Sequence, residues 1–214
     1  MSTAQRLLEL HDRLLAAYGP QGWWPGDTPF EVMVGAVLTQ NTNWANVERA
    51  IANLKEAGAL SLPAMSRLAP KRLAGLIRPA GYYNLKAKRL ANLLAMINQR
   101  YEGDLAWLLS QPTEELRRSL LAVKGVGPET ADSICLYAGG KPVFVIDAYT
   151  FRILGRHGLA DEEMGYFELQ ELFHDALPAD PQLFNEFHAL LVRLGKQRCK
   201  KTGPRCEGCP AEGW

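Results

Sequence analysis

The chain has 214 residues, of which 47% are hydrophobic and 22% charged. This composition is typical of a globular protein that buries a full core. The formal net charge is only +1, so the overall balance does not by itself indicate a nucleic-acid partner. The sequence contains no stretch apolar enough for a signal peptide or a membrane span, and we therefore expect a cytoplasmic protein without a membrane partner.

The N-terminal region predicts one amphipathic helix, over residues 3–18, that ends at Gly19-Pro20. The following stretch, QGWWPGDTPF, places Trp23 and Trp24 side by side between glycine and proline, which predicts a loop. Adjacent tryptophans cannot both face one core from a regular element. At least one is expected to be partly exposed or to line a cleft, with core anchoring of both as the alternative.

A strongly apolar helix is predicted over residues 30–38, and a second helix follows the polar junction TQNTN. Thr42 or Asn43 is the candidate N-cap of that second helix. Residues 55–101 read as short helices broken at glycine and proline, followed by a long helix with Lys86, Lys88 and Arg89 near its start. Cations gain nothing from the dipole at a helix N-terminus. They therefore indicate either a surface partner or a solvated face.

Two amphipathic helices joined by a tight Gly-Val-Gly turn are predicted over about residues 114–138. Gly125 and Gly127 are expected at positions where positive φ or close backbone approach tolerates no Cβ. Pro128 suits the first turn of the second helix. The exposed N–H groups of such a helix-hairpin-helix form an anion site suited to a DNA phosphate. An ordinary helix-helix turn is the alternative.

An apolar stretch after the hairpin ends in Asp147, just before the predicted helix AYTFRILGRHG. The helix dipole and free backbone N–H groups there lower the pKa of a carboxylate and keep it ionised. A simple N-cap role is the alternative. Further on, residues 193–205 carry six basic residues and no acid. Such a run either holds phosphates or is a solvated surface.

The hairpin and the aspartate together resemble the helix-hairpin-helix (HhH-GPD) DNA glycosylases related to endonuclease III, over nearly the whole chain. The matching residues are Gly125, Val126, Gly127, Thr130, Ala131, Val145, Ile146, Asp147, Phe151 and Arg152. The resemblance implies an all-α fold of two domains. These are a six-helix barrel over residues 28–140 and a helical domain of residues 1–27 and 141–214, which carries Asp147 and a cysteine loop.

The resemblance also implies a partner, double-stranded DNA containing a damaged base, and a monomeric protein of the bacterial type, associated with the nucleoid. It assigns the DNA contacts to one set of residues, Lys124, Gly125, Val126, Gly127, Thr130 and Gln40. Gln40 would enter the gap that the extruded base leaves. On the residues alone, the polar cluster around Gln40 is explained equally well as a cap and turn.

Asp147 is implied as the catalytic carboxylate that stabilises the oxocarbenium-like sugar while water adds. Relatives that also cut the strand carry a lysine in the helix after the hairpin, which forms a Schiff base with the sugar. Glu129 occupies that position and cannot form an imine. Lys124 and Lys141 lie nearby but not at that position. The expected enzyme is therefore monofunctional, without abasic-site lyase activity.

The stretch from Trp23 to Trp44 most resembles the 3-methyladenine glycosylase branch of this superfamily. The resemblance implies a base pocket formed by Trp23, Trp24, Pro25, Trp44 and Glu129. A 3-methyladenine base in DNA is cationic, and indole faces attract a cation by about 1–2 kcal/mol once it is desolvated. The positive charge also weakens the glycosidic bond, so no general acid is required.

Cys199, Cys206 and Cys209 have the spacing C-x6-C-x2-C. This spacing resembles the first three ligands of the 4Fe-4S cluster of endonuclease III relatives, whose fourth ligand would fall at position 215, one past Trp214. Such clusters normally take four thiolates, and the expected role is structural. Zinc bound with His188 or His157 is the alternative. Cys135 is expected to be a buried apolar thiol and not a ligand.

Two other functions remain open on the sequence. One is an endonuclease III-like glycosylase for oxidised pyrimidines, uracil or mismatches. The other is a DNA-binding module that recognises damage without cleaving it. Borohydride trapping of an enzyme–DNA adduct would identify the first, and lesion binding without release of any base would identify the second.

Overall fold

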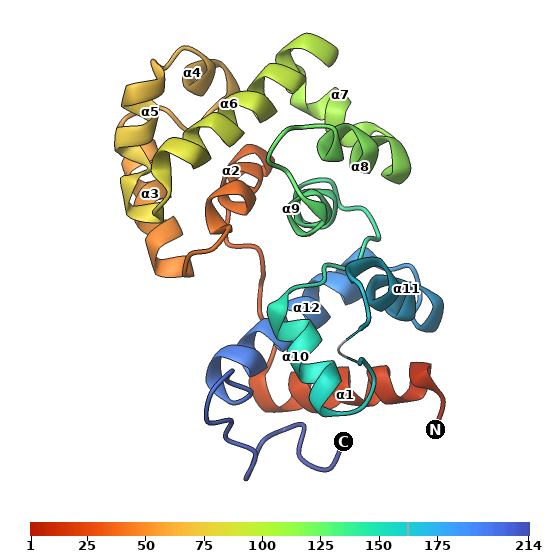
Figure 1. The fold of residues 1–214 in the computed structure, drawn as a ribbon. Helices are drawn as coiled ribbons and strands as arrows, with labels where there is room; N and C mark the ends of the chain where they lie inside the picture. The colour runs from red at the N-terminus through yellow and green to blue at the C-terminus, as the bar shows by residue number, and fades with distance from the viewer. Residues whose placement is uncertain (162) are drawn as a thin grey trace. The chain divides into compact units, whose positions relative to one another are not determined.

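The computed structural model describes residues 1–161 and 163–214, and all regular elements in them are helical, which confirms the all-α prediction. Figure 1 shows the course of the chain. It forms two compact units, a central unit of Trp24–Lys141 and a terminal unit of Met1–Trp23 with Pro142–Trp214. None of the described helices is long and apolar enough to cross a bilayer.

The central unit contains eight α-helices among the described residues, together with a 3-10 turn and a π-helical segment. They are α2 (Pro29–Thr39), α3 (Trp44–Glu56), α4 (Leu62–Ser66), α5 (Pro70–Leu76), η1 (Arg78–Ala80), α6 (Tyr83–Arg100), α7 (Leu105–Ser110), α8 (Thr113–Leu121), α9 (Pro128–Ser133) and the π-helical η2 (Ile134–Ala138). Helix α2 is buried from Phe30 to Leu38 and contacts α3, α6, α9 and η2. A helix that is apolar on all sides forms the core of its unit.

The junction after α2 follows the predicted cap chemistry. Asn43 is the N-cap of α3, because its side chain accepts a hydrogen bond from the backbone N–H of Asn46 at 3.0 Å. Thr28 caps α2 in the same way through the N–H of Glu31 at 3.2 Å. Gln40 is the C-cap residue of α2. These two caps therefore fix the N-termini of α2 and α3.

Lys86 departs from the prediction of an exposed cation, because only 1% of it is accessible. Its Nζ donates to the carbonyl oxygen of Leu38 at 2.8 Å and to that of Ala80 at 2.7 Å. Burial, and then the charge of Arg89, lower the pKa of Lys86 to about 8. Lys86 therefore joins α6 to the last turn of α2 and to η1. Its ammonium group is bound by these two carbonyl oxygens and does not lie on the surface as the sequence predicted.

Replacement of Lys86 by Met should lower the free energy of unfolding by roughly 2–3 kcal/mol, because two buried carbonyl groups lose their donor. The corresponding fall in Tm is about 5–10 °C and can be measured by thermal unfolding. Lys88→Met is the matched control, since Lys88 is exposed two residues along the same helix. Equal Tm values for the two variants would contradict this role of Lys86.

The terminal unit consists of α1 (Thr3–Tyr18), α10 (Ala148–Arg156), α11 (Tyr166–Ala176) and α12 (Pro181–Gln197). Helix α12 contacts α10 and α1, and α1 also contacts α11. The rings of Phe144 and Phe173 stack with centroids 3.7 Å apart, and Phe184 and Phe187 pack edge-on against Phe144. This aromatic core surrounds the segment that leads into Asp147.

Candidate active site

The hairpin turn joins α8 to α9, as predicted, but its two glycines differ. Gly125 has a φ of 98°, and a Cβ there would lie 2.5 Å from Cγ of Arg89. The expectation of a positive φ is wrong for Gly127, whose φ is −96°, and a Cβ there would meet no atom of this chain within 4 Å. Both the backbone conformation and the packing therefore require glycine at position 125. Neither of them requires glycine at position 127.

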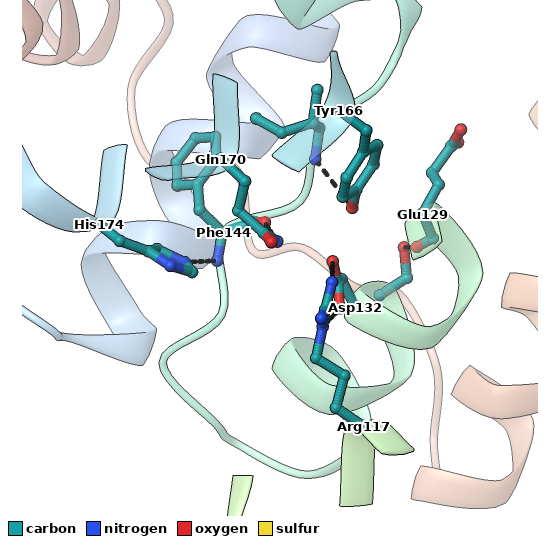
Figure 2. Close-up of polar contacts among 9 residues, drawn as sticks. Arg117, Glu129, Asp132, Phe144, Tyr166, Gln170 and His174 are labelled. Atoms are coloured by element: carbon teal, nitrogen blue, oxygen red, sulfur yellow. Dashed lines mark hydrogen bonds and ion pairs between the residues drawn. The ribbon is translucent and has the colours of Figure 1, made fainter. Parts of the chain in front are cut away.

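The residues predicted to contact DNA divide by exposure. Lys124, Gly125 and Gly127 are exposed, whereas Val126 and Thr130 are each only 6% exposed. A partly buried ion pair also joins the two hairpin helices, since Arg117 of α8 binds the buried Asp132 of α9 at 2.6 and 3.1 Å (Figure 2). The Arg117–Asp132 pair therefore fixes α8 against α9, while Lys124, Gly125 and Gly127 of the turn remain exposed.

Gln40 points toward the hairpin. Its Nε2 donates to the carbonyl oxygen of Gly125 at 3.2 Å and to Thr130 Oγ1 at 2.9 Å. Its Oε1 accepts a hydrogen bond from Arg89. Asn92 of α6 adds a bond to the carbonyl oxygen of Lys124 at 2.9 Å. Gln40 is thus docked on the hairpin, and entry into a DNA gap requires it to leave these partners.

Three of the predicted base-pocket residues lie together in the central unit. Trp24, Pro25 and Trp44 line a cavity of about 230 Å³. The rings of Trp24 and Trp44 meet edge to face with centroids 5.2 Å apart, and the ring of Tyr137, which the sequence did not indicate, lies 5.2 Å from Trp24. The other two predicted residues, Trp23 and Glu129, do not line this cavity.

Glycine lets the Trp24 indole lie close to α2. A Cβ at Gly35 would come within 3.1 Å of the Trp24 ring. Trp23, the last residue of the first segment of the terminal unit, has the Lys196 ammonium 5.9 Å from its ring centroid. The two adjacent tryptophans thus have different surroundings, as their position in a loop predicts.

Asp147 is the N-cap of α10. Its Oδ1 accepts hydrogen bonds from the backbone N–H of Thr150 at 2.8 Å and from the Thr150 hydroxyl at 3.0 Å. Its side chain is 13% exposed, and Oδ2 lies 3.6 Å from Nε2 of His188 on α12. Burial alone would raise the pKa of Asp147. The nearby His188, together with both Thr150 bonds, outweighs burial and holds that pKa below its ordinary value of 3.8.

The extended segment before Asp147 is held by side chains of α11 (Figure 2). The N–H of Phe144 donates to His174 Nε2 at 2.9 Å, and the carbonyl oxygen of Phe144 accepts from Gln170 Nε2 at 2.6 Å. The N–H of Ile146 donates to Tyr166 Oη at 3.5 Å. Buried backbone groups need such partners. Sequence reasoning did not identify these residues, because no local motif links α11 to Asp147.

The position of His188 leads to a prediction about pH. Because the folded-state pKa of Asp147 lies below 3.8, the unfolded chain binds this proton at a higher pH than the folded chain does. The carboxylate's contribution to stability is therefore complete above 3.8 and is lost as the pH falls through the folded-state value. His188→Ala removes an interaction that lowers the pKa, so the acid limb of any Asp147-dependent rate should move to higher pH.

The measurement for His188 is a pH–rate profile of the purified variants. His188→Gln keeps a hydrogen-bond donor without a positive charge, and it should move the acid limb less than His188→Ala does. An unchanged acid limb in both variants would show that His188 does not set the ionisation of Asp147.

Of the three C-terminal cysteines, Cys199 is held by two arginines of α10. The guanidinium of Arg156 donates to Cys199 Sγ at 3.2 Å, and Arg152 donates to the carbonyl oxygen of Cys199 at 2.7 Å. Burial raises the pKa of Cys209, and the nearby Cys199 and Cys206 add to this effect. Among the described residues, no three His, Cys, Asp or Glu side chains converge as metal ligands. As placed, the three thiols do not form a closed ligand set.

Comparisons with known proteins identify a family model and related sequences that match this chain. A family model described as "HhH-GPD superfamily base excision DNA repair protein" matches residues 34–179. A protein of Methanocaldococcus jannaschii whose name assigns it to the DNA repair glycosylases is 45% identical over 96% of this chain and 94% of its own length. Endonuclease III of Thermotoga maritima is 29% identical over 85% of this chain and 79% of its own.

Two solved structures show the same architecture. The H. pylori 3-methyladenine DNA glycosylase bound to 1,N6-ethenoadenine superposes with a TM-score of 0.79 at 32% identity, and the match covers 92% of this chain and 98% of that one. A trapped covalent intermediate of endonuclease III with DNA gives a TM-score of 0.83 at 24% identity, with 98% and 94% coverage. The second likeness concerns the fold alone.

Proposed function

Because this chain belongs to the HhH-GPD superfamily of base excision DNA repair proteins, we propose that it hydrolyses the N-glycosidic bond of a damaged base flipped out of double-stranded DNA. The observation that carries the proposal is Asp147. It lies on a fixed segment at a helix N-terminus, and its pKa is held below the ordinary value. Such a carboxylate stays ionised at neutral pH and can oppose a developing positive charge.

The proposed reaction needs few protein groups. Extrusion exposes the bond between C1′ and the base nitrogen, at a cost of roughly a few kcal/mol in unstacking. As that bond breaks, its electron pair leaves with the base, and the sugar gains oxocarbenium character that the Asp147 carboxylate stabilises. Water then bonds to C1′ and loses its proton, which completes hydrolysis. Thr150 holds one carboxylate oxygen, so the side chain needs little reorganisation.

We propose an alkylated purine such as 3-methyladenine as the base. Two observations support this choice, the indoles of Trp24 and Trp44 beside the cavity and the likeness to the H. pylori 3-methyladenine glycosylase. A cationic base gains cation–π attraction of about 1–2 kcal/mol from such rings. The likeness to endonuclease III of T. maritima keeps an oxidised or deaminated pyrimidine as the second candidate substrate.

We also propose that the enzyme is monofunctional. Glu129, in the first turn of α9, offers a carboxylate where the related lyases have an amine, and a carboxylate cannot form a Schiff base. The phosphodiester strand should therefore remain intact at the abasic site after base release.

The test is chromatography of the free bases released from methylated duplex DNA, with strand nicking scored before and after alkali. Release of 3-methyladenine without nicking before alkali supports the substrate and the single activity together. Absence of any alkylated purine would remove that substrate class, and duplexes with oxidised pyrimidines, uracil or mismatches would then identify the second candidate. Lesion binding without release of any base would indicate a non-catalytic module.

Cys199, Cys206 and Cys209 are proposed as ligands of an iron–sulfur cluster on the basis of their spacing and thiol chemistry. In this structure they do not converge, so the proposed cluster requires the loop to close around it. Iron content, acid-labile sulfide and visible absorption of the protein purified without oxygen test this proposal. A protein without iron or sulfide under those conditions would contradict it.

A further inference from the structure

The cavity beside Trp24 and Trp44 is also lined by charged side chains. Glu31 comes from α2, and Glu48 and Lys55 come from α3. Lys55 Nζ lies 2.9 Å from Glu31 Oε1 and 2.6 Å from Asp27 Oδ2. Two carboxylates therefore already neutralise the one basic side chain of the lining, and its charge is not available to a ligand.

Glu48 differs from Glu31. Among the residues that the structure describes, no cation forms an ion pair with Glu48, whereas the buried Glu31 has Lys55. Summing the three charged residues of the lining, Glu31 and Glu48 against Lys55, gives −1. A planar cation in this cavity would thus meet the two indole rings and an uncompensated carboxylate.

We propose that Glu48 is a specificity-determining residue that makes this cavity prefer cationic bases over neutral ones. The inference rests on the proposed function, because it takes the cavity as the place where the flipped base binds. A cationic base such as 3-methyladenine gains stacking and the attraction of Glu48. A neutral base such as 1,N6-ethenoadenine gains stacking alone and leaves the carboxylate without a counter-charge.

The experiment compares kcat/KM for 3-methyladenine and for 1,N6-ethenoadenine in the same duplex at low ionic strength. Glu48→Gln should lower the cationic-to-neutral ratio about threefold, the size of one exposed charge pair. Glu48→Lys should lower it about tenfold, because the charge reverses. Effects on general DNA affinity cancel in the ratio. The controls are Glu56→Gln and Glu56→Lys, since Glu56 is exposed on α3 and does not line the cavity.

A second readout separates this inference from the proposed function. Quenching of tryptophan fluorescence by 1-methylnicotinamide, a planar cation, is compared with quenching by neutral nicotinamide. The parent and the Glu56 variants should prefer the cation, and the Glu48 variants should lose that preference. If base release is absent but this pattern holds, the proposed function fails and the cation site stands. Unchanged ratios and unchanged quenching in the Glu48 variants would overturn the inference and leave the proposed function intact.

Discussion

Replacing Asp147 by Asn should reduce the rate of base release by roughly 10²–10³-fold, the cost of removing one electrostatic group aimed at a transition-state charge. The substitution keeps the shape of the side chain and an oxygen that can accept from Thr150. Asn is as good an N-cap as Asp, so α10 should still form. The variant should therefore bind lesion-containing DNA as the parent does, and single-turnover base release measures the loss.

Asp180→Asn is the matched control for Asp147→Asn. Asp180 is also an N-cap aspartate in the terminal unit, where it accepts a hydrogen bond from the N–H of Gln182 at 2.8 Å. The same chemical change there should leave the rate of base release unaltered. Equal losses in the two variants would mean that capping, and not catalysis, explains Asp147. A rate unaffected by Asp147→Asn would remove this residue from the mechanism.

Replacing Glu129 by Lys should create a covalent intermediate that borohydride traps on lesion DNA, whereas the parent should give none. Glu129 is exposed in the first turn of α9. The positive end of the helix dipole disfavours an ammonium ion there. The new lysine should therefore lose its proton readily and attack C1′ as a neutral amine. Denaturing gels that separate protein–DNA adducts from free strands provide the measurement.

Glu114→Lys is the control for Glu129→Lys, since Glu114 is an exposed acid in the first turn of α8. It makes the same change of charge in the central unit and should trap nothing. An adduct formed by the parent itself would show that another amine acts as nucleophile and would favour the endonuclease III-like alternative. If Glu129→Lys releases base but traps no adduct, position 129 does not reach the sugar.

Local sequence signals predicted much of the fold because the decisive contacts are close in the chain. The first helix, the cap at Asn43 and the hairpin before Pro128 each depend on neighbours within a few residues. Gly125 was predicted correctly for the same reason. Gly127 was not, because a Gly-x-Gly pattern does not show which glycine adopts positive φ.

The features missed from the sequence depend on contacts between distant segments. Lys86 reads as a surface cation, since its carbonyl partner at Leu38 is 48 residues away. The sequence offers His188 only as an alternative zinc ligand, because its place beside Asp147 results from α12 packing on α10. The π-helical turn of η2, which includes Tyr137, also lacks a local signal. In each case tertiary packing determines the role of the residue.

The segment before Asp147 makes its backbone hydrogen bonds with side chains of α11 and not with a neighbouring strand. A strand ladder would tie the position of the carboxylate to the alignment of two chains, in which a slip by one residue reverses every side chain. Here three individual side chains, Tyr166, Gln170 and His174, take the place of that ladder. The apolar residues of the segment can therefore change during evolution as long as they fill the same volume, whereas these three polar residues have to be retained together.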